Sequence, residues 1–186
     1  MLQLIFGNKM VFYGLLIGEL GLVIALSAAI NRISATTASL MFLLYSALNG
    51  ITFASIFLIY TQSSIASTFF ITAGTFAAMS VFGMVTKRDL TGWGSFLFMG
   101  LIGIIIASVV NIFLHSPMIT WVVSYLGVFI FVGLTAYDTQ KLKRISQMGF
   151  ADGQSRRKAV ILGALTLYLD FINLFLMLLR VLGSRR

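Results

Sequence analysis

Long apolar runs separated by short polar breaks dominate the chain. Each run is close to the roughly 20 residues that a helix needs to cross the hydrocarbon core of a bilayer. The alternating pattern of a β-barrel is absent, so the runs predict transmembrane helices. Six are predicted, over Met10–Ile30, Ala38–Tyr60, Ile65–Val85, Trp93–Leu114, Met118–Tyr137 and Ala159–Leu182. Because several connections are short, we expect an all-α integral membrane protein, a compact bundle forming one domain over residues 1–186.

Composition agrees with this fold class and excludes others. The 186 residues are 59% hydrophobic and 10% charged, with no cysteine, and the mean hydropathy is +1.02. Such a chain cannot be a soluble enzyme, a disordered protein or a disulfide-bonded secreted domain. The net charge of +8 could suggest nucleic-acid binding. The basic residues instead lie between apolar segments without a groove-reading motif, so the expected surroundings are the lipid bilayer and no nucleic acid.

The basic residues also predict an orientation. The second and fourth connections between the predicted spans carry no lysine or arginine, whereas the first, third and fifth are basic. By the positive-inside rule the basic connections are cytoplasmic, which leaves the N-terminus outside. These connections contain Arg32, Lys87 and the stretch Lys141–Lys158. The first segment is too long for the apolar part of a signal peptide and carries Glu19.

Asp170 is the strongest candidate for chemistry. It lies about midway between Lys158 and Arg180, roughly 15–18 Å from each along a helix, and therefore near the middle of the membrane. A charged Asp there costs about 2.5–3.5 kcal/mol, so an acid at this depth indicates a functional site. Helical spacing places Thr166 and Asn173 on the same face. The alternative is a protonated, purely structural Asp bonded to a neighbouring helix.

Asp138 lies at the cytoplasmic end of its segment, where an ion pair with Lys141 is the alternative to a functional role. Its helix and that of Asp170 are consecutive and antiparallel, so they are plausible neighbours, although Asp138 counts as near the edge and Asp170 as near the centre. If the two meet, their carboxyl groups cannot both ionise cheaply and would share a proton. Once ionised, the pair would offer hard oxygen ligands suited to Ca²⁺.

Other titratable groups give weaker signals. Glu19 lies within the first predicted span, where it either lines the same cavity or is protonated and structural. His115 lies near a loop, where a histidine is usually solvated. With one histidine and no cysteine, a zinc site or a Ser-His-Asp triad has little support, and we expect no cofactor.

Two stretches resemble the signature of the Bax inhibitor family, its bacterial branch above all: GLTAYDTQK at Gly133–Lys141 and GALTLYLDFINLFLMLLR at Gly163–Arg180. The resemblance covers nearly the whole chain. It implies a helical bundle with the last helix central, in the bacterial inner membrane. It also implies a pH-sensitive Ca²⁺ leak channel, in which Asp138 and Asp170 share protons and bind the transported Ca²⁺. Some bacterial members resemble regulators of a membrane-bound ATP-dependent protease, which is the expected alternative function.

The chain departs from this family in two respects. Members usually have seven spans, and Met10–Ile30 resembles the second of them, so a counterpart of the first is not expected here. The family also has a basic residue late in the second helix that latches onto the aspartate pair; Arg32 is the candidate here, but its register differs from the family's. Glu19, Thr166 and Asn173 are further candidates for latch or pore-lining residues.

An enzyme is the third reading. Two membrane aspartates, one of them preceded by a tyrosine (Tyr137), are similar to intramembrane aspartyl proteases. Those proteases have a Gly-x-Gly-Asp motif and a Pro-Ala-Leu motif. Here the residues before Asp170 are Leu-Tyr-Leu and the only proline is Pro117, so we expect no enzymatic activity.

Overall fold

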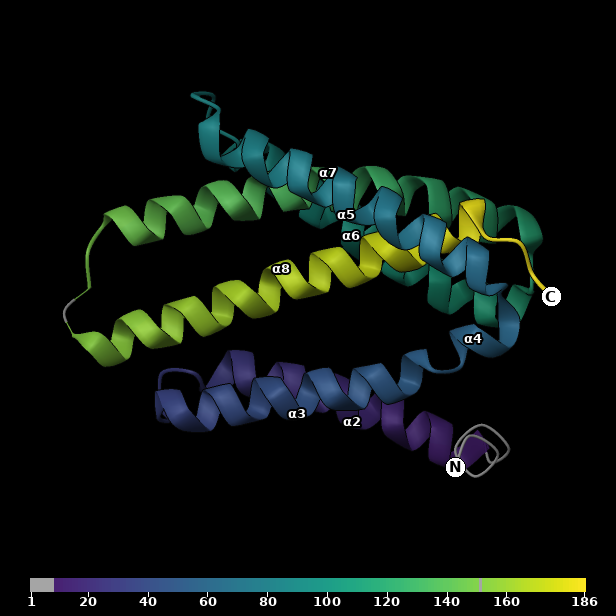
Figure 1. Ribbon diagram of the computed structural model, residues 1–186, viewed down its shortest axis with the longest axis horizontal. Helices are drawn as coiled ribbons and strands as arrows, with labels where there is room; N and C mark the ends of the chain where they lie inside the picture. Colours follow the sequence, from purple (N-terminus) through teal and green to yellow (C-terminus); the bar gives the residue numbers. More distant parts are fainter. Residues whose placement is uncertain (1–8, 151) are drawn as a thin grey trace. The chain divides into compact units, whose positions relative to one another are not determined.

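The computed structural model describes residues 9–150 and 152–186, which are helical apart from short connections (Figure 1). An isolated backbone bridge joins Tyr60 to Arg185. The helices are α2 (Lys9–Ala29), α3 (Ala35–Phe53), α4 (Ile56–Ile59), α5 (Gln62–Val85), α6 (Thr91–Leu114), α7 (Pro117–Gln147) and α8 (Gly153–Leu182).

The all-α membrane class predicted from the apolar runs is confirmed. Five segments are long and apolar enough to cross a membrane: α5, α6, α7, α8, and α3 together with α4 as one stretch, Ala35–Ile59. The first predicted span forms α2, a helix of 21 residues. Its apolar part among the described side chains is Ile17–Ala29, so the sixth crossing stays a prediction.

The polar stretch Lys141–Lys158 was expected to connect two helices, and this expectation is wrong for most of its length. Helix α7 continues ten residues beyond the predicted end at Tyr137, and α8 begins at Gly153 rather than at Ala159. Apolar patterning ends where side chains become polar, but Lys, Gln and Arg favour helix as strongly as Leu does. The connection is therefore short, and Gly149 supplies a left-handed residue in it, with φ of +77°.

The second predicted span, Ala38–Tyr60, is not one continuous helix. It is broken at Ala54 and Ser55, between α3 and α4. The hydroxyl of Ser55 donates to the carbonyl of Thr52 over 2.8 Å, and the N–H of Ser55 reaches the same carbonyl over 3.2 Å. These bonds satisfy backbone groups that would otherwise lack partners at membrane depth, which makes the break tolerable.

The structure divides into two compact units, here called unit 1 and unit 2. Unit 1 lies within residues 1–61, 150–165 and 185–186 and contains α2, α3, α4 and the first part of α8. Unit 2 covers residues 62–149 and 166–184 and contains α5, α6, α7 and the second part of α8. The single domain and the central place of the last helix remain predictions.

In unit 1, α2 and α3 pack against each other as an antiparallel pair (Figure 1). The buried residues of α3 include Ala38, Tyr45, Asn49 and Thr52, whose spacing of seven, four and three places them on one face. Leu26 of α2 is fully buried. A polar strip therefore runs within an otherwise apolar helix pair.

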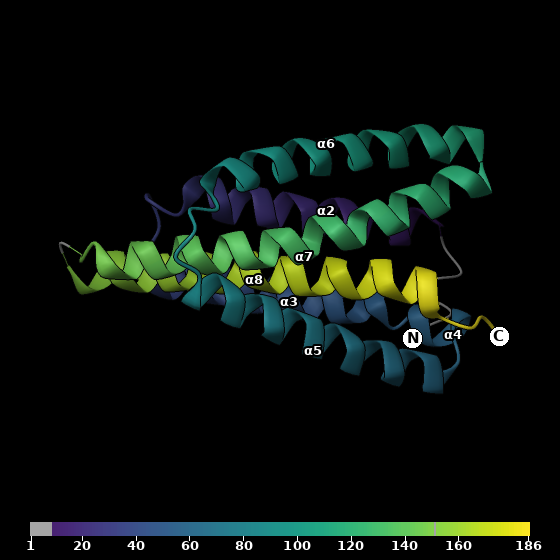
Figure 2. The ribbon, with the colours of Figure 1, turned by 90° about the horizontal axis from the view of Figure 1, so that it is seen from above.

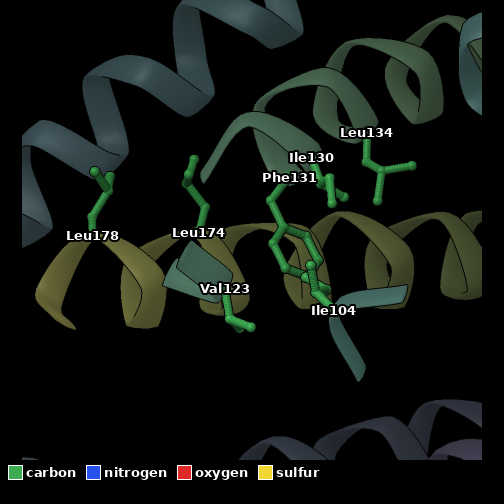
Figure 3. Close-up of a cluster of buried hydrophobic side chains, with 7 residues drawn as sticks. All are labelled: Ile104, Val123, Ile130, Phe131, Leu134, Leu174 and Leu178. Carbon is green, nitrogen blue, oxygen red and sulfur yellow. The ribbon is translucent and has the colours of Figure 1, made fainter. Parts of the chain in front are cut away.

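In unit 2, α7 packs between α5 and α6 (Figure 2). Where α7 meets α8, a cluster of buried apolar side chains fills the interface (Figure 3). The cluster consists of Ile104, Val123, Ile130, Phe131, Leu134, Leu174 and Leu178. Phe69 and Phe76 of α5 pack edge-on against Phe171 of α8. These contacts fix the second part of α8 against both α5 and α7.

Glycines allow α7 to approach its neighbours closely. A Cβ added to Gly83 of α5 would collide with the backbone of Ala136, and one added to Gly94 of α6 would collide with the ring of Tyr137. In membranes, where the hydrophobic effect does not drive helices together, such close backbone contact supplies much of the packing energy. Both contacts lie within two residues of Asp138, so the tightest packing in this part of α7 surrounds that residue.

Candidate functional site

Unit 2 brings Asp138 and Asp170 together. Asp138 projects from α7 and Asp170 from the second part of α8, and their carboxyl groups are close enough to interact directly. Asp170 is 5% exposed, and Asp138 is partly buried. The two residues singled out by the sequence are therefore neighbours in the structure.

The helices that carry the two residues are longer than the apolar runs predicted. With α7 continuing to Gln147, Asp138 lies roughly 13 Å from the end of its helix rather than at the end. With α8 starting at Gly153, Asp170 lies roughly 25 Å from the start of its own. Both aspartates are thus placed inside long helices that extend past the apolar runs.

Carboxyl groups in this arrangement have limited options. Two carboxylates within hydrogen-bonding distance repel each other, and a shared proton removes that repulsion. Oδ2 of Asp170 is buried and has no hydrogen-bond partner among the described residues. This oxygen can therefore accept a proton, a water molecule or a cation.

The part of α7 next to Asp138 carries buried hydroxyl groups that donate hydrogen bonds within their own helix. Thr135 and Thr139 are buried, and each hydroxyl donates over 2.7 Å to the carbonyl one turn earlier. A hydroxyl that donates in this way keeps its oxygen lone pairs free to accept. The helix thus lines the neighbourhood of Asp138 with oxygen atoms.

A polar clamp ties the extended end of α7 to the connection between α5 and α6. Gln140 donates to the carbonyl of Arg88 over 2.8 Å and accepts from the N–H of Leu90 over 3.0 Å. Arg144 forms an ion pair of 2.7 Å with Asp89. The hydroxyl and N–H of Thr91, together with Arg144, hold the pKa of Asp89 well below its usual range.

Thr166 and Asn173 are the other predicted site residues of α8. Asn173 uses its amide to donate to the carbonyl of Leu169 over 2.8 Å within its own helix. Thr166 is partly buried. Among the described residues no salt bridge joins Asp138 to Lys141, although the Lys141 ammonium is near enough to attract the carboxylate. The same ammonium lies 5.9 Å from the centroid of the Tyr137 ring.

Glu19 and Arg32 belong to unit 1. Glu19 is buried in α2, where it accepts a hydrogen bond of 2.5 Å from the hydroxyl of Thr52. Arg32 is exposed in the turn between α2 and α3. Their expected roles as latch or pore-lining residues remain proposals.

Sequence reasoning missed Thr52 as the partner of the acid in α2, and Asn49 as a buried polar residue on the same face of α3. A signal for them existed, because Tyr45, Asn49 and Thr52 recur at helical spacing inside an apolar run. The pattern shows that this face of α3 is polar. It does not show which helix the face meets.

Comparison with known proteins places the chain among a group of bacterial membrane proteins. The family described as "Inhibitor of apoptosis-promoting Bax1" matches residues 1–186. The inner membrane protein YbhL of Escherichia coli K12 is 58% identical over 186 residues, which are all of this chain and 80% of that protein. An uncharacterized protein of Borreliella burgdorferi is 54% identical over 183 residues, covering 98% of this chain and 79% of that protein. One from Rickettsia prowazekii is 45% identical over 186 residues, or 76% of its length.

Proposed function

Because this chain belongs to the Bax inhibitor family, we propose that it is a pH-sensitive calcium leak channel controlled by the protonation of Asp138 and Asp170. The observation that carries the proposal is the meeting of these two side chains in unit 2. Neither residue is needed for helix formation, and an acid as deeply buried as Asp170 needs a reason to be in a membrane span.

The proposed switch is electrostatic. With one proton between them, the two carboxyl groups attract and hold α7 against the second part of α8. When that proton leaves, two unit charges about 4 Å apart repel each other by about 4 kcal/mol at an effective dielectric constant near 20. A repulsion of this size is enough to shift a two-state equilibrium between helix arrangements.

The same pair is the proposed point of contact with Ca²⁺. Ca²⁺ takes 6–8 oxygen ligands, of which the two carboxylates supply up to four. Water and neighbouring hydroxyl oxygens such as that of Thr139 would supply the rest. Partial coordination of this kind suits an ion that passes through rather than one that stays bound.

We also propose that the basic connections face the cytoplasm, in the inner membrane of a bacterium. Arg32, Lys87 and the exposed Lys141 and Lys143 would lie on that side. The polar clamp between Arg144 and Asp89 would then lie at the cytoplasmic surface. Labelling of single cysteines introduced at Lys87 and at His115 by an impermeant reagent tests this orientation, since only one of the two should react from outside.

The test of function is Ca²⁺ uptake into proteoliposomes at about pH 6 and pH 8. The wild-type protein should show a flux that depends on pH. In Asp170→Asn the ratio of the two fluxes should fall close to one, because the pair no longer has two ionisable members. Asp152→Asn is the matched control: it removes an acid outside the membrane, and Asn still caps the start of α8. Unchanged pH dependence in Asp138→Asn and Asp170→Asn proteins that are folded would refute the proposal.

A further inference from the structure

Unit 1 contains a buried acid, Glu19, in addition to Asp170 of unit 2, and the proposed switch does not use it. Glu19 of α2 is 7% exposed and Thr52 of α3 is 8% exposed. The Thr52 hydroxyl donates to Oε1 of Glu19 over 2.5 Å. When it is ionised, an acid at this depth in a membrane span needs a counter-charge.

Asn49 provides an independent sign of a missing ligand. It is 6% exposed, and its amide Nδ2 pairs with the hydroxyl of Tyr45 over 2.8 Å. Its carbonyl Oδ1 is buried and has no partner among the described residues. A buried amide oxygen normally accepts a hydrogen bond or coordinates a cation. Asn49 lies one turn before Thr52 on the same face of α3, so the two side chains are neighbours.

We infer that Glu19, Asn49 and Thr52 form a binding site for a small monovalent cation, with Na⁺ as the best-fitting probe. A carboxylate, a hydroxyl and an amide oxygen are hard ligands, and a single carboxylate balances a single positive charge. A divalent ion would leave one charge uncompensated. The site lies wholly within unit 1 and shares no residue with the aspartate pair, so it stands or falls independently of the proposed calcium function.

The direct test is equilibrium binding of ²²Na⁺ to the purified full chain in detergent at about pH 8, without Ca²⁺. The wild-type protein should bind Na⁺ saturably. Glu19→Gln removes the charge and Thr52→Val removes the hydroxyl at nearly constant volume, and each should weaken binding at least about tenfold. Ser39→Ala is the matched control, because it removes a hydroxyl of α3 that bonds to Ala35 far from the site. Asp170→Asn should also bind normally.

Thermal unfolding gives a second readout that does not depend on isotope binding. Exchanging N-methylglucamine chloride for NaCl at constant ionic strength should raise the melting temperature of the wild type by about 5 °C under saturating Na⁺, and should not raise that of Glu19→Gln. Absence of Na⁺ binding in the folded wild type overturns the inference. Binding that survives in Glu19→Gln, or that is lost in Asp170→Asn, overturns it as well. Stabilisation by acid alone, without an effect of Na⁺, would show that Glu19 simply takes up a proton.

Discussion

Replacing Gly83 by alanine tests the close packing of α5 on α7 beside the aspartate pair. A Cβ at this position would lie 3.1 Å from both the carbonyl carbon and the Cα of Ala136, and closer still to the carbonyl oxygen. These are backbone atoms, so no side-chain rotation can relieve the collision. Because carbon atoms pack best at about 3.5–4.0 Å, α5 must move away from α7 by roughly 1 Å.

The magnitude follows from comparing two opposing effects. Overpacking of a close contact costs about 1–3 kcal/mol, and an obstructing backbone places Gly83→Ala towards the upper end of that range. Alanine favours helix over glycine by about 1 kcal/mol, which offsets part of this cost. In Gly74→Ala, on the same helix, the new Cβ meets nothing within 4 Å. That variant should therefore be as stable as the wild type or more stable, and the two variants should differ by about 1–3 kcal/mol.

The assay is reversible unfolding of the detergent-solubilised protein by a denaturing detergent, followed by circular dichroism. Because Ala136 is two residues before Asp138, Gly83→Ala should also alter the pH dependence of Ca²⁺ flux, whereas Gly74→Ala should not. Equal stability of the two alanine variants would refute the reasoning, since it would mean that α5 and α7 are not in backbone contact at Gly83.

Two further predictions concern the polar clamp and the core of unit 2. The pKa of Asp89 lies below its ordinary value of 3.8, first because of the Thr91 hydroxyl and then because of the Thr91 N–H and Arg144. The ion pair between Arg144 and Asp89 should therefore be complete above pH 3.8 and be lost only as the pH falls through the lowered pKa of Asp89; carboxyl ¹³C NMR of Thr91→Val should show the titration of Asp89 moving up towards 3.8. Leu174 is fully buried, so Leu174→Ala should lower the free energy of unfolding by about 2 kcal/mol or more, while Leu182→Ala, at a half-exposed position, should change it little.

The positions of the membrane helices could be predicted from the sequence because apolar length is a local property. A run of about 20 apolar residues can satisfy its backbone in lipid only as a helix. The ends were less accessible to prediction. Residues of α7 beyond Tyr137 are polar enough to leave the bilayer, but their backbone hydrogen bonds continue to Gln147. Hydropathy indicates whether a side chain favours lipid or water, but it does not indicate whether the backbone stays helical.

The candidate site, like the helices, could be predicted from the sequence only in part. The sequence identified Asp170 as an acid near the middle of a span, and burial of its side chain agrees with that placement. Counting residues could not show that Asp170 meets Asp138, because positions along each helix do not determine how the two helices pack. The meeting of the two side chains depends on how α7 and the second part of α8 pack, through contacts such as those of Phe131 and Leu174.

Taken alone, the sequence determined the all-α membrane class, the position of Asp170 within its span and, through motif resemblance, the family. These depend on short-range properties: the length of apolar runs, the cost of a charge in lipid and the order of residues in a motif. Only the tertiary structure decided that Asp138 meets Asp170, that Thr52 bonds to Glu19 and that Asn49 keeps an unpartnered oxygen. Each of these depends on which faces of distant helices pack together, and that choice is made by the sum of many weak contacts rather than by any one segment.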